Sequence, residues 1–528
     1  MGWFLTCQPL EEQEMDIWLL ILPSLSFATA LALLLQATNH GTKKRRLPPG
    51  PLSVPILGNL FWLWRSLQEL ESILRELHSR YGPIVTLHVG SHPAIFISDR
   101  TLAHRALIEH GAIFSDRLAP RPAARFFGNP QRLISSAAYG PLWRLLRRNL
   151  ISDILHSSRV KLYAHGRAWV LKVLTNHLRS QADSNGAGAV TAMESFQFAM
   201  FCLLVLMCFG EKLDEKGIKD IEIANRRLLL YANKLNVLVF APRISRYIFR
   251  NRIKTSLQMR QTQTELFVPL IKARKEYKNQ QQHKIEEERY VYSYADSLLD
   301  MEIPEEGGRK LTEEEMVSLC SEFLTAGTDT TSTALQWIMA NLVKHQGIQA
   351  KLLEEIEGVV GKDEEEIKEE DLQRMPYLKA VILEGLRRHP PAHFVVPHKV
   401  TEDVTLDGYL IPQNASINFM VAEMGRDGKV WEEPMEFKPE RFLAGGSGEG
   451  VDITGSREIK MMPFGVGRRI CPGLGLAMLH LEYFVANLVR EFEWRAVDGK
   501  EVDLSEEPEF TVVMKKPLRA CILPRRRS

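Results

Sequence analysis

The sequence predicts a mainly α-helical protein with a minor β-sheet component, built as a single large domain behind an N-terminal transmembrane anchor. Three observations lead to this prediction. From about residue 100 onward, apolar residues recur with helical spacing. Alternation of apolar and polar residues, which is typical of strands, is confined to a few short stretches. One uncharged run near the N-terminus is long enough to cross a lipid bilayer.

The composition is that of a globular protein and excludes several classes. The 528 residues are 45% hydrophobic and 25% charged, which is ordinary for a folded domain. The formal net charge of +2 gives no basic field, so no nucleic acid is expected as a partner. The six cysteines include no CxxC pair and indicate reduced thiols rather than a disulfide framework.

The N-terminal region predicts a membrane anchor. Residues 17–37 carry no charge and are followed by the basic run KKRR at 43–46, so the positive-inside rule places the rest of the chain in the cytosol. A cleaved signal peptide is the alternative, but the apolar run is too long and has no small-residue cleavage site before the basic run. We expect a lumenal segment at 1–16, the signal-anchor at 17–37 and a basic, proline-rich hinge at 38–55, which the prolines make stiff and non-helical.

The domain that follows, residues 56–528, begins with mixed signals. Helical spacing predicts a helix from Leu67 to Tyr81, and the alternating IVTLHVGSHPAIFIS that follows predicts a β-hairpin. Further strand-like pieces lie near 399–410 and 510–522.

Two polar runs, at 279–289 and 361–371, are most simply solvated loops or helix faces. Because no long linker divides the chain after residue 56, we expect one domain rather than the several that the length favours.

A long helix is predicted from Thr312 to about Lys344. Thr312 and Glu315 have the spacing of a capping box, and the helix would be roughly 50 Å long at 1.5 Å per residue. Its centre, AGTDTT at 326–331, consists of weak helix formers. We therefore expect a local distortion of the helix at this point.

The segment PFGVGRRICPG, 463–473, surrounds one cysteine with glycines and arginines. Cys471 precedes a helix, so the helix dipole together with Arg468 and Arg469 favours a thiolate. The residues alone leave three possibilities open for Cys471: a nucleophile, a single metal ligand or an inert core residue.

The pattern of Phe464, Gly467, Arg469, Cys471 and Gly473 resembles the haem-binding loop of the cytochrome P-450 monooxygenases. Other marks of that family occur in the same order along about the last 480 residues: PPGP at 48–51, WRLLRR at 143–148, AGTDTT at 326–331, EGLR at 384–387 and FKPERF at 437–442. The sequence after the cysteine is most similar to plant microsomal members, and in particular to plant family eighty-nine, subfamily A.

The resemblance implies a cofactor, haem b (iron protoporphyrin IX), with Cys471 as the axial thiolate on the iron. Phe464 would pack near the sulfur and backbone amides of the loop would hydrogen-bond it. The propionates would be bound by arginine and indole side chains, and His398 is either a further propionate ligand or a structural hydrogen bonder. The implied cofactor-binding residues are Trp143, Arg147, His398, Phe464, Arg469, Cys471 and Gly473.

The resemblance also implies a role for the weak helix formers at the centre of the long helix. Ala326 and Gly327 would leave room for oxygen, and the hydroxyl of Thr330 would turn away from the regular helix. Asp329 and Thr330 then resemble the catalytic acid–alcohol pair that delivers protons to dioxygen.

A second implied group is structural rather than catalytic. Glu384 and Arg387, spaced i,i+3, resemble the family's buried ion pair, which Arg441 completes as a triad.

The function that the resemblance implies is a membrane-anchored monooxygenase of the endoplasmic reticulum. It would insert one atom of O₂ into a small hydrophobic molecule in plant specialised metabolism. We find no flavin or nicotinamide unit, so electrons are expected from NADPH–cytochrome P-450 reductase. Arg144, Arg148 and Arg468 would form part of its docking face, or are general surface charge.

Two alternatives remain. A haem-thiolate isomerase or dehydratase would need neither O₂ nor reductase, and the Asp329–Thr330 pair argues against it. A non-catalytic haem-binding membrane protein is the other.

Substrate contacts are expected from Arg117–Leu133, Phe323–Ala326, 391–396 and Thr511–Met514. The aromatic and branched residues there suggest a hydrophobic pocket, although any core has the same composition. They are Phe126, Phe127, Phe323, Phe394 and Val395.

Overall fold

The computed structural model describes residues 47–52, 59, 67–89, 92–118, 130–185, 188–232, 247–281, 291–361, 366–499 and 501–525. The expected anchor at 17–37, the segment 1–16, most of the hinge at 38–55, most of the polar run at 279–289, Phe126 and Phe127 lie outside these residues.

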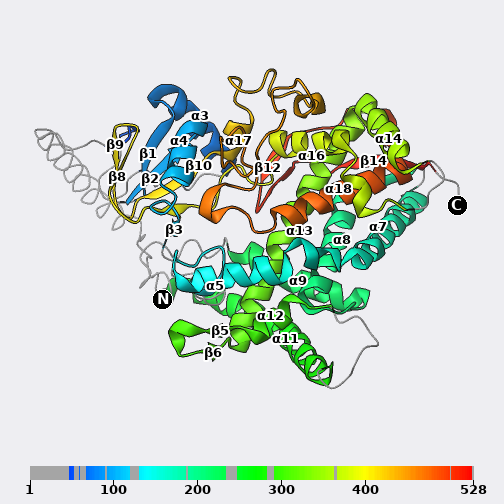
Figure 1. Ribbon diagram of the computed structural model, residues 1–528, viewed down its shortest axis with the longest axis horizontal. Coiled ribbons are helices and arrows are strands. Elements are labelled where there is room, and N and C mark those ends of the chain that lie inside the picture. The colour runs from blue at the N-terminus through cyan, green and yellow to red at the C-terminus, as the bar shows by residue number, and fades with distance from the viewer. Residues whose placement is uncertain are drawn as a thin grey trace, which may run out of the picture.

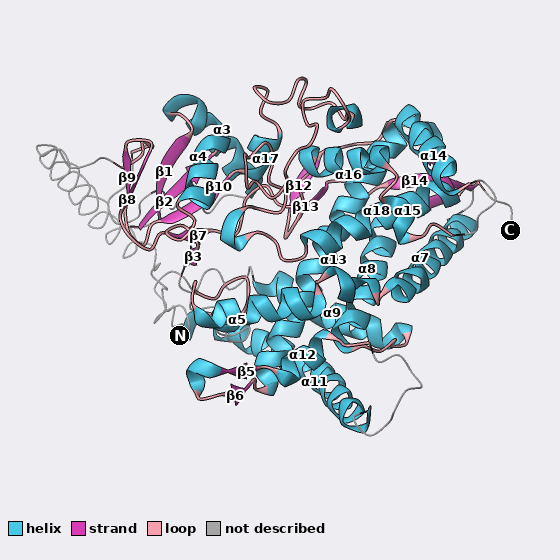
Figure 2. Cartoon of the chain, viewed as in Figure 1, coloured by secondary structure: helices cyan, strands magenta, loops and turns pink. Residues whose placement is uncertain are grey.

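Helices make up most of the described chain, which confirms the predicted fold class (Figure 2). They are α3 Leu67–Tyr81, α4 Arg100–His104, α5 Pro141–Asn149, α6 Ser157–Lys161, α7 Ala164–Asn185, α8 Ala192–Phe209, α9 Glu215–Ala232, α11 Arg250–Gln281, α12 Tyr294–Asp300, α13 Glu313–Lys344, α14 Gln346–Val360, α15 Glu369–Leu372, α16 Pro376–Arg388, α17 Val421–Gly425 and α18 Leu474–Glu491.

The strands are short. They are β1 Ile84–Val89, β2 His92–Ile97, β3 Asp116–Arg117, β4 Ala189–Thr191, β5 Glu302–Ile303, β6 Arg309–Lys310, β7 His398–Lys399, β8 Val404–Leu406, β9 Tyr409–Ile411, β10 Ser416–Phe419, β11 Phe492–Ala496, β12 Glu506–Pro508, β13 Val512–Met514 and β14 Arg519–Pro524. The largest sheet among the described residues has the order β1-β2-β10-β7-β3. It lies with α3 and α4 at one end of the molecule, and the longer helices fill the rest (Figure 1).

Several elements are where the sequence predicts them. Helix α3 has the expected bounds, and β1 pairs antiparallel with β2, with Ile84 opposite Ile97. The strand-like pieces at 399–410 and 510–522 contain parts of β7, β8 and β9 and of β13 and β14. In the polar run at 361–371, α14 has already ended and α15 begins only at Glu369.

Helix α13 passes through the centre of the molecule, beside α8, α16 and α18 (Figure 1). It begins with the predicted capping box: Thr312 Oγ1 accepts from the Glu315 amide at 3.2 Å, and the Glu315 carboxylate accepts from the Thr312 amide at 2.8 Å. The helix then continues without a break for 32 residues.

The distortion expected at the weak centre of α13 is therefore not observed as an interruption. Instead, Thr328 and Thr330 donate their hydroxyls to the carbonyls of Leu324 (2.8 Å) and Ala326 (2.7 Å), four residues back. These side-chain hydrogen bonds follow the helix rather than compete with it, which corrects the expectation that the Thr330 hydroxyl turns away from the helix.

Helix α8 is apolar on every side. In the described part of the chain it is the one helix with the length and composition to cross a membrane, yet 89% of it is buried. It packs against α7 and α13, so a helix that is hydrophobic all round here forms the core of the helical part.

The end of the proline-rich hinge lies against the sheet. The Thr86 amide in β1 donates to the Pro49 carbonyl at 2.8 Å. A Cβ on Gly50 would lie 1.9 Å from the Thr86 carbonyl oxygen, so only glycine permits this approach.

Candidate functional site

The loop before α18 positions Cys471. Gly473 is the N-cap of α18, so Cys471 lies just ahead of the helix, as predicted. The Cys471 amide donates to the Phe464 carbonyl at 2.9 Å, which closes the loop on itself. Gly467 has a φ of 74°, and a Cβ there would lie 2.2 Å from the Leu107 carbonyl oxygen. Gly467 therefore allows the loop to lie directly on the segment after α4.

The protonation of Cys471 differs from the expectation. Burial raises the pKa of the Cys471 thiol, and this outweighs the opposing effects of the Gly473 amide and the Arg147 charge. The helix terminus and the arginine act in the predicted direction, but in the protein alone the neutral thiol is favoured.

Arg147 and Arg469 both lie close to the Trp143 ring. Their guanidinium carbons are 5.3 Å and 4.3 Å from its centroid, and the indole N–H donates to the Ile134 carbonyl at 3.0 Å. Arg147 donates to the Ile470 carbonyl at 2.5 Å, one residue before the cysteine. The structure thus brings Trp143, Arg147 and Arg469 together beside Cys471.

The guanidinium of Arg469 is bound by backbone carbonyls rather than by a carboxylate. It donates to Ser115 (2.8 Å), Ile134 (3.3 Å) and Ala137 (2.7 Å). Burial lowers the pKa of Arg469 to about 10, which shows how poorly its charge is compensated.

Arg117 in β3 is a further member of this group that the sequence analysis did not assign to the haem site. It donates to the carbonyls of Ser135 (2.8 Å) and Val396 (2.8 Å). Burial, and then the charge of Arg469, lower the pKa of Arg117 to about 9. Its neighbour Asp116 is already engaged with Lys399 at 2.7 Å. No sequence signal links β3 to the cysteine loop, since the two are more than 300 residues apart.

His398 lies opposite Arg117 in the β3–β7 pairing. Its Nδ1 is 2.5 Å from the Phe114 carbonyl oxygen, so this nitrogen carries the proton. Burial, and then the charges of Arg117 and Arg469, lower the pKa of His398 to about 3. The ring lies beside the arginines and is hydrogen-bonded to the Phe114 carbonyl. The structural role is therefore present, and the propionate role stays a prediction.

One face of α13 is accessible near the middle of the helix. Ala326 is exposed and Thr330 is half-buried, although Thr328 and Thr331 next to them are buried. Gly327 does not share this face: a Cβ there would lie 2.8 Å from a methyl group of Leu204 on α8. Gly327 therefore serves the close packing of α8 on α13, and its expected role in leaving room for oxygen stays a prediction.

Asp329 lies on the side of α13 that faces α8 and α9. Its Oδ1 accepts from Gln197 Nε2 at 3.2 Å and is 3.7 Å from Arg226. Burial raises the pKa of Asp329, against the effects of Arg226 and Gln197. A carboxyl with a raised pKa beside polar partners is suited to holding and releasing a proton.

The predicted triad comes together in full. Arg387 donates to both Glu384 oxygens, at 2.7 and 2.8 Å, and both side chains are fully buried. Arg441 Nε lies 3.3 Å from Glu384 Oε1, which also accepts from the Lys438 amide at 2.8 Å. The triad joins α16 to the segment before the cysteine loop.

The described residues of the expected pocket divide into two groups. Phe323 is buried against Tyr294, with ring centroids 5.1 Å apart, and belongs to the core. Phe394 and Val395 are half-buried, and a Cβ on Gly465 in the cysteine loop would lie 3.9 Å from Val395. The segment 391–396 thus borders the cysteine loop.

These residues fit a haem. A thiol in a glycine-rich loop offers one metal ligand, and arginines held by carbonyl oxygens offer uncompensated positive charge for carboxylates. The exposed stripe of α13 supplies a wall without large side chains.

A family model described as Cytochrome P450 matches residues 48–522. The chain belongs to the cytochrome P450 family. It is 49% identical over 518 residues to Cytochrome P450 89A9 of Arabidopsis thaliana, covering 96% of this chain and 98% of that one. This supports membership of family 89, subfamily A.

More distant relatives support the same family. The flavonoid 3'-monooxygenase of Arabidopsis thaliana is 30% identical over 505 residues, covering 95% of this chain and 96% of that one. A zebra fish cytochrome P450 solved with abiraterone shares the fold, with a TM-score of 0.69 at 23% identity, covering 87% of this chain and all of that one.

The chain is therefore a haem-thiolate monooxygenase, with haem b as its cofactor, that uses O₂, a hydrophobic substrate and a redox partner.

Proposed function

We propose that this chain is a membrane-anchored monooxygenase of plant specialised metabolism in the endoplasmic reticulum, with Cys471 as the axial ligand of its haem. The observation that supports it is Cys471 itself, held in a glycine-rich loop ahead of α18 and beside Arg147. Haem b, when bound through a thiolate, supplies the activation of O₂.

The other residues have distinct roles in this proposal. Arg117, Arg147 and Arg469, whose guanidiniums are held by backbone carbonyls, would bind the propionates of the haem. Trp143 orients the two guanidiniums that lie close to its ring, and Phe464 and Gly473 shape the loop around the sulfur.

Proton delivery is assigned to Asp329 and Thr330. Asp329 takes up a proton on the side of α13 that faces α8 and α9, where Gln197 and Arg226 hold its carboxyl. Thr330 lies on the accessible face beside Ala326, and its hydroxyl donates to the Ala326 carbonyl. The hydroxyl oxygen would therefore accept a hydrogen bond and hold a proton donor at this face.

The first test is the carbon monoxide difference spectrum of the dithionite-reduced protein in membranes. We expect a strongly red-shifted Soret band for the wild type and its loss in Cys471→His, in which an imidazole replaces the thiolate. A wild-type band at the unshifted position would contradict Cys471 as ligand and with it the oxygenase reading.

We propose NADPH–cytochrome P-450 reductase as the redox partner, docked on the face that α5 presents. Arg144, Arg148 and Arg468 are all exposed. The guanidiniums of Arg144 and Arg468 lie 5.8 and 5.3 Å from the centroid of the Tyr139 ring, so these two form one patch. A basic patch close to the haem suits an acidic electron donor.

Charge reversal tests the docking face. Arg144→Glu with Arg148→Glu should slow reduction by the reductase about tenfold or more at low salt and flatten its salt dependence. Lys216→Glu with Lys275→Glu, two exposed positions on α9 and α11, is the control with the same change in charge. Equal rates in the two double variants would rule out this face.

A further inference from the structure

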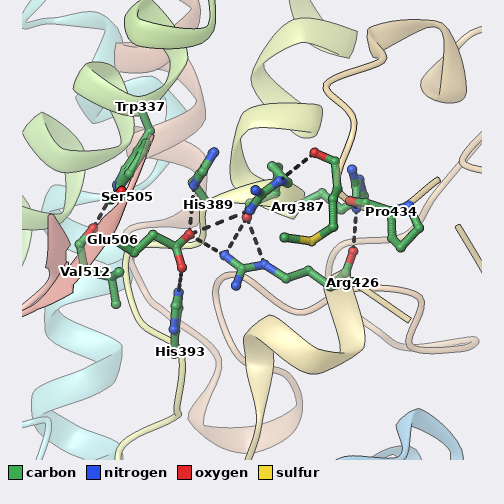
Figure 3. A network of polar contacts seen from close by, with 12 residues as sticks. Trp337, Arg387, His389, His393, Arg426, Pro434, Ser505, Glu506 and Val512 are labelled. Atoms are coloured by element: carbon green, nitrogen blue, oxygen red, sulfur yellow. Dashed lines mark hydrogen bonds and ion pairs between the residues drawn. The ribbon is translucent and has the colours of Figure 1, made fainter. Parts of the chain in front are cut away.

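A group of charged and imidazole side chains lies at the base of the β12–β13 hairpin, away from the cysteine loop. We define the Glu506 cluster as Glu506, His389, His393, Arg388 and Arg426; Figure 3 shows its centre. Glu506 Oε1 is 2.9 Å from His389 Nδ1 and is ion-paired with Arg426. His393 Nε2 and Arg388 lie 3.6 and 3.7 Å from the same carboxylate. None of the five side chains is more than 21% exposed.

The cluster is a fixed charge arrangement. Burial would raise the pKa of Glu506, but the hydrogen bond from His389 and the charges of Arg426 and His393 outweigh it and hold that pKa well below its usual range. Burial lowers the pKa of His389 to about 3. Near neutral pH the carboxylate is therefore ionised, and a neutral His389 donates to it from Nδ1. Arg426 is fixed in turn by the Arg388 carbonyl, at 2.8 and 3.1 Å.

On one side, the cluster holds the hairpin. The Val512 amide donates to the Pro391 carbonyl at 2.8 Å, and Thr511 Oγ1 is 2.8 Å from Thr333 Oγ1 on α13. The hairpin residues Glu509, Phe510 and Thr511 line a small cavity together with Asp329. The tip of the hairpin therefore lies at the candidate proton-delivery site.

On the other side, the cluster holds the segment 389–396. His389 is stacked on Trp337 of α13, with centroids 4.0 Å apart and planes 3° from parallel. His393 Nδ1 is 2.7 Å from Glu71 on α3. Two residues beyond His393, Val395 borders Gly465 of the cysteine loop.

We propose that Glu506 is a positioning residue that fixes the distance between two segments. One is the tip of the hairpin, which lies at Asp329, and the other is the segment 391–396, which lies at the cysteine loop. By fixing this distance, Glu506 sets which sizes of ligand the pocket accepts. Glu506 belongs to the hairpin, and its carboxylate contacts His389 and His393 of the segment 389–396. The charge of this carboxylate therefore holds the two segments together. The inference rests on the proposed function, since it takes both segments to face the haem pocket.

The test compares Glu506→Gln with Glu507→Gln in the haem-loaded full chain. Glu507 is the exposed neighbour in the same strand, so the control makes the same change in charge without touching the cluster. The readouts are the carbon monoxide spectrum and the dissociation constants of imidazole and 4-phenylimidazole, from the spectral shift each causes on the haem iron.

We expect Glu506→Gln to keep the red-shifted band. We also expect the affinity for 4-phenylimidazole, the bulkier ligand, to rise by about fivefold relative to the affinity for imidazole. Glu507→Gln should change this ratio by less than about twofold. A general loss of stability would weaken both ligands equally and leave the ratio unchanged.

The outcomes separate the two proposals. An unshifted band in the wild type defeats the proposed function, whereas a normal band with an unchanged ratio in Glu506→Gln overturns the positioning role alone. If Glu506→Gln fails to take up haem, Arg426→Lys is tested in its place, because it weakens the same ion pair from the arginine side. A wild-type ratio of the two dissociation constants in Arg426→Lys overturns the proposal, and a shifted ratio supports it.

Discussion

Asp329 on α13 destabilises the folded protein, and its proposed role in proton delivery explains why such a residue is present. Asp329 is a buried carboxyl whose pKa is raised by burial. A folded-state pKa above the unfolded value of about 3.9 means that the folded protein binds the proton more tightly. Stability is therefore lost as the pH rises through the range between these two values, and the cost persists at neutral pH.

Asp329→Asn should remove that cost and also the proton donor. We expect turnover to fall by about a hundredfold while the free energy of unfolding rises by about 0.5–2 kcal/mol at pH 7. Thermal unfolding of the haem-loaded protein at pH 7 and pH 4.5 measures this. The gain should shrink at the lower pH, because a larger fraction of Asp329 is protonated there than at pH 7. A gain independent of pH would contradict the argument.

Thr330 and Thr328 form a matched pair. Both hydroxyls donate to the carbonyl four residues back, but Thr328 is buried and Thr330 lies on the exposed face beside Ala326. Thr330→Ala should divert most of the NADPH consumed to hydrogen peroxide, whereas Thr328→Ala should keep the wild-type yield of product. Peroxide release that is equal in the two variants would assign no special role to Thr330.

At the scale of elements, burial determines what an ion pair contributes. Arg387 and Glu384 on α16 are fully buried, whereas the equally spaced pair Arg374–Asp371 has an arginine that is 63% exposed. Removing Arg387 leaves the buried Glu384 carboxylate without its bidentate partner and with Arg441 as its remaining counter-ion, whereas the partners of an exposed pair are solvated by water.

Arg387→Ala should therefore destabilise the protein by about 3–5 kcal/mol and abolish the shifted carbon monoxide band in most of the expressed protein. Arg374→Ala, which breaks a pair of the same i,i+3 type, should cost less than about 1 kcal/mol. Chemical denaturation and the yield of shifted band report the difference. Similar losses in the two variants would show that the triad is not a special support of the haem side.

Elements with strong local signals were predictable. The capping box located the start of α13, and alternation located the β1–β2 hairpin, because both signals lie within a few neighbouring residues. The strands of two or three residues, such as β3 and β7, are too short to show a period. Cys471 was found by its local pattern, whereas Arg117 and Glu506 reach their partners only through tertiary packing. The side of α13 that Gly327 occupies likewise depends on where α8 lies.

For the whole molecule, the contact of Pro49 and Gly50 with β1 predicts where the catalytic body begins. Removing residues 1–37 should release the protein from membranes and leave the shifted band intact. Removing residues 1–52 should also lower the melting temperature, because the strand loses this contact. Failure of the shorter truncation to take up haem would contradict the predicted separation of anchor and domain.

Helix α8 also has a consequence for biosynthesis. It leaves the ribosome about 135 residues before α13, the helix that covers it, has been completed. At a translation rate of about 5–20 residues per second, this delay lasts roughly 7–27 s. Throughout that time the nascent chain carries an uncovered apolar helix long enough to enter a translocon as a second span. Correct topology then depends on α7, which precedes α8, and on chaperones that shield α8 until α13 arrives.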